Sequence, residues 1–173
     1  TAKMFCTTGK ASRELNEILE GKVENVFMCV GGMGHVSSIA LGYALDNKHD
    51  SAVVCIDGDG SYLMHLGSSS LIADLNPRSF IHVILNNGVL ESVGGGRTSI
   101  GSIDFKRLGY GLGYKLVYSV QDAADLKQAL REAVVSKCTT LIEVQINVGS
   151  AENLSRPSKS PHENLARFMG QSQ

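Results

Sequence analysis

Short runs of apolar residues alternate along this chain with longer segments in which apolar residues recur at intervals of three and four. Short apolar runs are typical of buried strands, and the three-and-four spacing is typical of amphipathic helices. The alternation, which contains no internal repeat, predicts a doubly wound, mostly parallel α/β sheet with helices on both faces. Strands are predicted at 26–30, 52–56, 80–85, 115–118 and 140–146, and helices at 11–19, 36–45, 61–75, 104–112, 120–136 and 163–169.

The 173 residues are enough for one domain with a sizeable core. We expect this domain to span 1–149. From Gly149 onward the sequence becomes polar, so we expect 150–173 to be a tail that docks on the same domain or on a partner. The first residue is Thr1 rather than methionine, which suggests that the chain is a piece of a longer protein.

Composition narrows the classes of function. The chain is 43% hydrophobic with a formal net charge of −1 and no evident basic cluster, so we expect neither a nucleic acid nor a membrane surface as partner. No apolar run approaches the roughly 20 residues that cross a bilayer, and the first residues lack the apolar core of a signal peptide. The four cysteines lack metal-ligand spacing, which favours buried thiols and a reducing, cytoplasmic location.

The first of two neighbouring predicted strands ends in a loop with specific chemistry. Its sequence is DGDGS, in which Gly58 and Gly60 allow a sharp turn and a close approach of the backbone to a ligand. The start of the helix that follows would suit a phosphate. Asp59 would repel that phosphate unless a Mg²⁺ ion lay between them, because Mg²⁺ binds carboxylates together with phosphate oxygens.

The next predicted strand ends at a pair of asparagines, the second of which is Asn87. Parallel strands joined by a crossover helix have their carboxyl ends at the same edge of the sheet. The amide oxygen of Asn87 and the backbone carbonyl of Val89 could therefore join Asp59 around a metal ion. Taken singly, GDG and NN are turns in most proteins, and that interpretation stays open for each of them.

GDGS followed at this distance by NN resembles the diphosphate and Mg²⁺ motif of thiamine-diphosphate (TPP) enzymes. The resemblance implies that Asp59, Asn87 and the carbonyl of Val89 hold the metal. It also implies that Gly58, Asp59, Gly60 and Ser61 bind the cofactor.

A second glycine-rich loop, GGMGH at 31–35, follows the first predicted strand. Alone it is a weak signal. Beside the GDG and NN pair it resembles the loop that holds the aminopyrimidine of TPP, in which Gly31 and Gly32 contact the cofactor and Met33 supports its bent shape. His35 is a candidate catalytic residue of the same loop. A core methionine, and a histidine that only caps the next helix, are the alternatives.

The segment after the two asparagines is long and rich in glycine, and such loops carry function more often than folding. Glu91 and Ser92 are its candidate catalytic residues, for proton or substrate contacts. Arg97 could pair with an acidic substrate. Lys10 and Arg13, near the first helix, could meet a substrate anion. A solvated surface position is an open alternative for each of these five side chains.

The chain resembles the carboxyl-terminal, TPP-binding half of the phosphonopyruvate decarboxylase family. The motifs that carry the resemblance run in order along it: TTGKASREL, VGGMGHVSSIALG, CIDGDGSYLMHLGS, LNNGVLESVGG and RPSKSPHENLARFM. The beta subunit of sulfopyruvate decarboxylase is a close relative. The resemblance implies a lyase of phosphonate metabolism that uses TPP and Mg²⁺ to convert phosphonopyruvate to phosphonoacetaldehyde and CO₂. It departs at Gly96-Arg97, where the family more usually has glutamine and proline, so the substrate is implied less firmly than the cofactor.

In TPP enzymes, a glutamate that activates the aminopyrimidine comes from a second domain, usually across a subunit interface. The resemblance therefore implies that this chain is half of an active site, which is completed in an oligomer by a pyrimidine-binding domain or subunit. Two alternatives remain: a TPP-dependent enzyme acting on another 2-oxoacid, and a non-enzymatic interaction domain. The intact Asp59 and Asn87 argue against the second.

Overall fold

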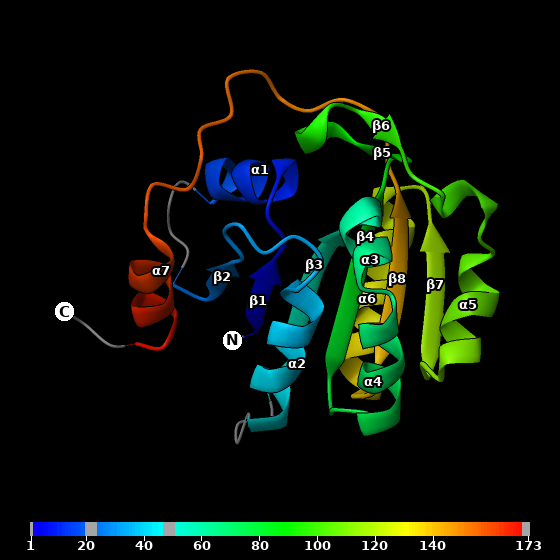
Figure 1. Cartoon of the computed structure of the whole chain (residues 1–173). Helices are drawn as coiled ribbons and strands as arrows, with labels where there is room; N and C mark the ends of the chain where they lie inside the picture. The colour runs from blue at the N-terminus through cyan, green and yellow to red at the C-terminus, as the bar shows by residue number, and fades with distance from the viewer. Residues whose placement is uncertain (1, 20–23, 47–50, 171–173) are drawn as a thin grey trace.

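The computed structural model describes residues 2–19, 24–46 and 51–170, and its main feature is one parallel sheet (Figure 1). Six strands of the described part lie in the order β2-β1-β3-β4-β8-β7, and every pairing between neighbours is parallel. The predicted doubly wound α/β architecture is thereby confirmed. The strands are β1 (Lys3–Cys6), β2 (Val26–Met28), β3 (Val53–Gly58), β4 (Phe80–Asn86), β7 (Leu116–Val120) and β8 (Thr140–Gln145).

Helices cover both faces because successive strand residues point to opposite sides. On β3, Val53 and Cys55 pack in one core cluster with α2 (Val36–Asp46), α4 (Gly67–Leu75) and α5 (Phe105–Leu112). On the other face, Val54 packs with α6 (Ala123–Ser136), and Ile56 with α1 (Lys10–Ile18). Within the described residues, no helix is long and apolar enough to cross a membrane.

Several elements differ from the sequence prediction. The chain has a strand β1 that was not predicted, and it lies inside the sheet between β2 and β3. The single helix predicted at 61–75 is two helices, α3 (Asp59–Met64) and α4, because the backbone leaves the helical conformation at His65 (φ −134°, ψ 46°). α6 also starts later than predicted, since β7 continues to Val120 and the Asp122 carboxylate caps the helix.

The glycine-rich segment 88–98 forms a small hairpin, which we call the site hairpin. Its strands β5 (Val89–Leu90) and β6 (Gly96–Arg97) pair antiparallel and flank the 3₁₀ turn η1 (Glu91–Val93). Gly94 and Gly95 have φ values of 91° and 72°, a conformation that favours glycine, and they close the turn. A second 3₁₀ turn, η2 (Ile100–Ser102), leads to α5.

After β8 the chain crosses above α1 before it forms α7 (Pro161–Phe168) beside β2 (Figure 1). We call residues 149–160 the strap. Its Ala151 amide donates to Glu14 of α1 at 3.1 Å, and its Ser155 hydroxyl donates to Glu17 at 2.9 Å. α7 begins with a capping box between Ser160 and Glu163.

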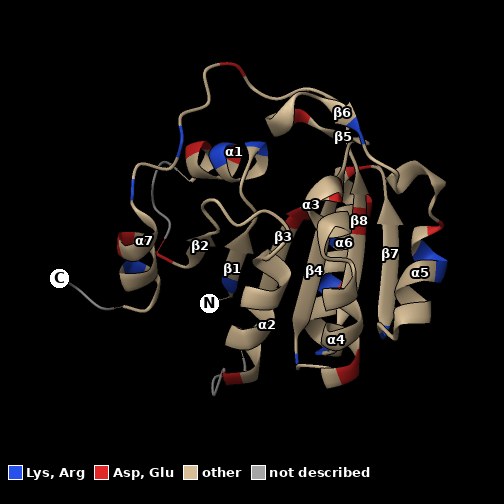
Figure 2. Cartoon of the chain, viewed as in Figure 1, with Lys and Arg blue, Asp and Glu red and all other residues tan. Residues whose placement is uncertain are grey.

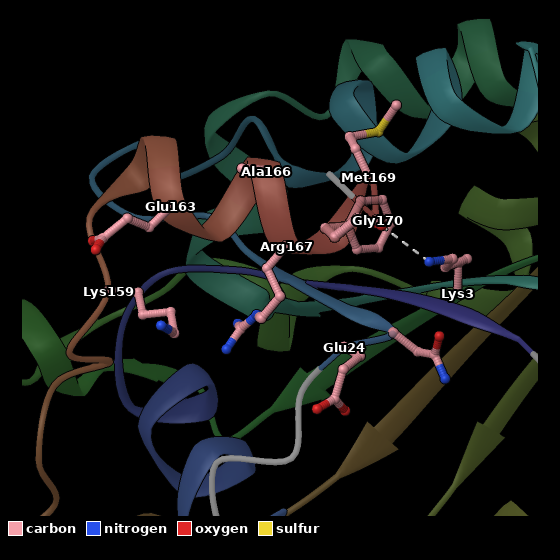
Figure 3. A pocket seen from close by; sticks show the side chains of 10 residues that line it. Lys3, Glu24, Lys159, Glu163, Ala166, Arg167, Met169 and Gly170 are labelled. Carbon is pink, nitrogen blue, oxygen red and sulfur yellow. Dashed lines mark hydrogen bonds between the residues drawn. The ribbon is translucent and has the colours of Figure 1, made fainter. Parts of the chain in front are cut away.

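Aromatic packing holds α7 against the sheet. The ring of Phe168 is buried, with its centroid 5.0 Å from Phe5, 5.8 Å from Phe27 and 5.4 Å from Tyr43. Lys3 Nζ donates to the Phe168 carbonyl at 3.1 Å. A hollow of about 580 Å³ beside this contact is lined by charged residues of both signs, among them Lys159, Arg167, Glu24 and Glu163 (Figure 3).

Candidate functional site

The sheet changes direction between β1 and β3. From β1 the chain passes through α1 to β2 on one side, and it then returns to place β3 on the other side of β1. Ligands of open α/β sheets bind at such a switch point, outside the carboxyl ends of the strands. A narrow pocket of about 90 Å³ lies there, between residues that follow β1, β3, β4 and β8. Its lining includes Thr7, Thr8, Lys10, Gly58, Asp59, Asn87, Glu91 and Gly149.

The two loops that were predicted to meet do meet in this pocket. Asp59, the first residue of α3, is buried with 2% of its surface exposed. It lines the pocket together with residues of the loop after β4, where the Gly88 N–H donates to Asn86 Oδ1 at 3.1 Å. Asn87 lies in that same loop, and its Oδ1 accepts from the Val89 N–H at 3.1 Å. The β3 and β4 loops therefore form one site.

The electrostatics of Asp59 suit a cation. Burial raises the pKa of this carboxyl above its ordinary value, because desolvation disfavours the charged form. The influences that lower its pKa are hydrogen bonds, from the Thr98 hydroxyl at 2.5 Å and from backbone N–H groups, and none of them is a positive charge. A bound metal ion would supply that charge.

The donor set also fits Mg²⁺. Asp59, Asn87 and the Val89 carbonyl offer only hard oxygen atoms, which this ion prefers. No group of three or more His, Cys, Asp or Glu side chains that could hold a metal occurs among the residues with described positions. With one carboxylate in the set, an ion here would need further oxygens from a ligand such as a diphosphate.

Ser61 joins three loops of the site. Its Oγ accepts from the Gly34 N–H at 2.9 Å and lies 2.9 Å from the Thr7 hydroxyl. It therefore connects the residues after β1, the 31–35 loop and the start of α3. Gly60, beside it, lies against the site hairpin: a Cβ added there would be 2.2 Å from Cδ2 of Leu90. A side chain at Gly60 would push the hairpin away.

The 31–35 loop reaches the pocket through Met33, which lines it. Gly31, Gly32 and His35 are not among the lining residues. His35 is exposed, and its ring stacks on that of His65 with centroids 4.2 Å apart. The structure thus brings Met33 to the pocket and leaves His35 at its outer margin.

Of the other predicted site residues, Lys10, Glu91 and Ser92 line the pocket. Arg13, on α1, is half-buried, and Arg97, on β6, is exposed. Neither of the two arginines lines the pocket. Glu91 Oε1 accepts hydrogen bonds from Asn87 Nδ2 at 2.9 Å and from the Gly149 N–H at 2.5 Å.

Sequence reasoning missed part of the pocket. Thr7 and Thr8 follow β1, so a prediction of that strand would have placed them at the same sheet edge as Asp59. Thr98 belongs to the site hairpin, and Gly149 and Ser150 belong to the strap. The paths of these two segments cannot be predicted from local sequence patterns. These five residues contact Asp59 or line the pocket.

Residues 8–144 match the family described as "Thiamine pyrophosphate enzyme, C-terminal TPP binding domain". The chain is 40% identical over 167 residues to phosphonopyruvate decarboxylase of Streptomyces hygroscopicus, covering 96% of this chain and 41% of that protein. It is 38% identical over 138 residues to the sulfopyruvate decarboxylase subunit beta of Methanocaldococcus jannaschii, covering 78% of this chain and 70% of that subunit.

Solved structures share the fold. Benzoylformate decarboxylase of Polynucleobacter necessarius superposes with a TM-score of 0.69 at 21% identity, over 87% of this chain and 31% of that one. The chain thus spans about two fifths of the length of the phosphonopyruvate decarboxylase it matches, and most of the length of the beta subunit.

Proposed function

Since this chain belongs to the family of thiamine pyrophosphate enzymes, as their C-terminal TPP-binding domain, we propose that it forms the diphosphate- and Mg²⁺-binding half of a TPP-dependent 2-oxoacid decarboxylase. The observation that carries the proposal is the meeting of two loops at adjacent strand ends. There Asp59, at the start of α3, lines the same pocket as Asn87 and Val89, which follow β4. Asp59, Asn87 and the Val89 carbonyl would hold the metal.

Among 3-substituted pyruvates, phosphonopyruvate is our first candidate substrate. The relative with 40% identity over almost the whole chain is a phosphonopyruvate decarboxylase. Sulfopyruvate is the second candidate, because a beta subunit of sulfopyruvate decarboxylase is 38% identical over 138 residues, which cover 70% of that subunit. A non-catalytic domain ranks below both, since Asp59 and Asn87 are intact and lie in one site.

When bound, TPP supplies the carbanion that attacks the keto carbon and the electron sink that accepts the electrons left by CO₂. The chain's own residues would bind and orient. Gly58, Gly60 and Ser61 would lie along the diphosphate, and Met33 would support the cofactor from the 31–35 loop with Gly31 and Gly32. The strap and the site hairpin would exclude water from one side of the pocket.

The substrate would carry two anionic ends, so cations are needed near the pocket. Lys10 lines the pocket and is our first candidate for this contact. Arg13 and Arg97 lie further out, on α1 and β6, and would have to turn inward. Ser92 lines the pocket as a candidate for proton or substrate contacts, and His35 is a candidate at its margin.

We also propose that a pyrimidine-binding domain or a second subunit completes the site in an oligomer. α2 and α4 are joined by a 2.8 Å contact between the Ser37 and Ser68 hydroxyls, and neither helix contains a lysine or arginine. Figure 2 shows charges on α1, α5 and α7, whereas α2 is charged only at its end. Exposed apolar side chains lie on these two helices and at the end of α3: Ile39, Leu45, Met64, Leu71 and Leu75. Such a face suits a subunit partner.

The proposal is tested on the full-length protein with TPP and Mg²⁺, by measuring aldehyde release from phosphonopyruvate, sulfopyruvate and pyruvate side by side. Preference for phosphonopyruvate supports the first substrate, and preference for sulfopyruvate supports the second. Release from pyruvate alone would contradict both.

Substituting Asp59→Asn should abolish the cofactor-dependent binding of Mn²⁺, followed by electron paramagnetic resonance, because it removes the one carboxylate of the set. In the wild type, Mn²⁺ affinity should fall as the pH is lowered, since a proton competes with the metal for this carboxylate. Because burial raises its pKa, the fall should begin at a higher pH than for an ordinary aspartate. Full Mn²⁺ affinity in the Asp59→Asn variant would overturn the assignment of the metal site.

A further inference from the structure

The Glu91 carboxylate, beside the pocket, accepts two hydrogen bonds from other parts of the chain. Its Oε1 accepts from the side-chain amide of Asn87 at 2.9 Å and from the backbone N–H of Gly149 at 2.5 Å. One oxygen thus connects the loop after β4 with the strap. We propose that Glu91 is a positioning residue, which fixes the amide of Asn87 for the metal and ties the strap over it; this inference rests on the function proposed above.

The orientation of Asn87 follows from these contacts. An asparagine amide has one end that donates and one that accepts. Because Nδ2 donates to Glu91, Oδ1 points away from that carboxylate, toward the Val89 N–H at 3.1 Å. The reversed amide would place two oxygen acceptors against each other. An amide oxygen has two lone pairs, so Oδ1 keeps one for a cation while it accepts from Val89.

The same oxygen is linked to the rest of the tail. Gly149 begins the strap, which is bound further along by Glu14 and Glu17 of α1. Glu91 differs from these two carboxylates because it alone of the three contacts a proposed metal ligand in the described structure. Groups that orient a metal ligand typically change metal affinity 10–100-fold when they are removed.

The hydrogen bonds separate positioning from a role of Glu91 as a proton carrier. Both donors bind Oε1, so a glutamine at 91 can accept both bonds with its amide oxygen while it carries no charge and exchanges no proton. An aspartate keeps the charge but is one methylene shorter and loses the reach. If Glu91 positions Asn87, Glu91→Gln should keep more of the wild-type Mn²⁺ affinity than Glu91→Asp. If its charge or its proton is what matters, Glu91→Asp should keep more.

The experiment measures Mn²⁺ affinity by electron paramagnetic resonance in the full-length protein, at a saturating concentration of TPP. We expect Glu91→Ala to weaken Mn²⁺ binding by about 10–100-fold, Glu91→Asp to weaken it by an intermediate factor and Glu91→Gln to stay close to the wild type. Turnover of the alanine variant should recover substantially when the metal concentration is raised to saturation. Because Glu91 is half-exposed on a 3₁₀ turn, all three variants should fold.

Glu17→Ala is the matched control, because Glu17 also binds the strap, through Ser155, but lies on α1 away from Asn87. It should leave Mn²⁺ affinity unchanged. Equal weakening in Glu17→Ala and Glu91→Ala would assign the effect to the strap and overturn the positioning of Asn87. So would wild-type Mn²⁺ affinity in Glu91→Ala, or loss of turnover in Glu91→Gln at saturating metal.

Failure of the proposed function gives a different result. If the wild-type protein itself binds no Mn²⁺ in the presence of TPP, the metal site is wrong and the inference on Glu91 falls with it. If the wild type binds and only the Glu91 series departs from the expected order, the proposed function stands and the inference on Glu91 is overturned.

Discussion

At the scale of single residues, the least predictable feature is a polar pair buried beneath the site. Asp57 and His82 are both fully buried, and His82 Nδ1 lies 3.2 Å from the Tyr114 hydroxyl. His82 Nε2 and Asp57 Oδ2 are 3.8 Å apart, and neither atom has a hydrogen-bond partner within the described part of the chain. The alternation of Val53, Cys55 and Asp57 predicts that the carboxylate faces the core, but it does not say which side chain it meets there.

Substitution of His82 tests how much this pair contributes. His82→Ala should lower the free energy of unfolding by about 3 kcal/mol, because it removes a packed ring and leaves Asp57 and the Tyr114 hydroxyl without their neighbour. The measurement is urea unfolding followed by circular dichroism. His65→Ala is the matched control: His65 is exposed and only stacks on His35, so a change within about 0.5 kcal/mol is expected. Equal effects would show that the buried pair contributes nothing specific.

The meeting of the two loops that contain Asp59 and Asn87, in contrast, could be predicted from the residues. Asp59 and Asn87 each follow a long apolar run, and parallel strand ends share an edge. Their position in one site is therefore a consequence of the order of elements alone. The hydroxyl of Thr98 and the backbone of Gly149 reach the same place through a hairpin and a strap, and their contacts depend on tertiary packing that leaves no local signal in the sequence.

At the scale of elements, five of the six strands described in the parallel sheet were predicted, and β1 was not. β1 contains only four residues, begins with a lysine and is stabilised mainly by pairing on both sides with β2 and β3. The apparent helix over 61–75 has apolar residues at suitable positions throughout, so periodicity alone could not locate its break at His65. Strand pairing decides that β1 forms, and the path of the chain over the sheet decides where α3 ends. Both are properties of the folded sheet.

α5 offers a matched pair of glycines for a test of packing. A Cβ added at Gly109 would lie 2.8 Å from both Cγ atoms of Val117 and 3.0 Å from Cδ2 of Leu141, whereas one added at Gly111 would meet nothing within 4 Å. Gly109→Ala should therefore destabilise the protein by about 1–3 kcal/mol. Gly111→Ala should be neutral or stabilise it by up to about 1 kcal/mol, since alanine favours helix. Thermal and urea unfolding of the two variants would check this, and a stable Gly109→Ala would refute the close packing of α5 on the sheet.

At the scale of the whole molecule, α2 and α4 present an apolar face without lysine or arginine, and this face is our proposed contact for the other half of the enzyme. Leu71 on α4 is 52% exposed. Leu71→Asp should weaken assembly of the full-length protein at least tenfold, measured by analytical ultracentrifugation, because a charge would be desolvated in the contact. Ile18→Asp, on α1 and 76% exposed, is the control and should assemble normally. Unchanged assembly of Leu71→Asp would remove this face from the proposal.

The strap should make the protease sensitivity of the molecule depend on what occupies the pocket. It runs from the pocket to the far edge of the domain and is held at the pocket by Glu91 and along α1 by Glu14 and Glu17. A protease can cleave such a segment only when it detaches from these carboxylates. A ligand that favours the attached state should lower the cleavage rate in proportion to its occupancy. Limited digestion between 150 and 160 would then report how full the pocket is, with no need to observe turnover.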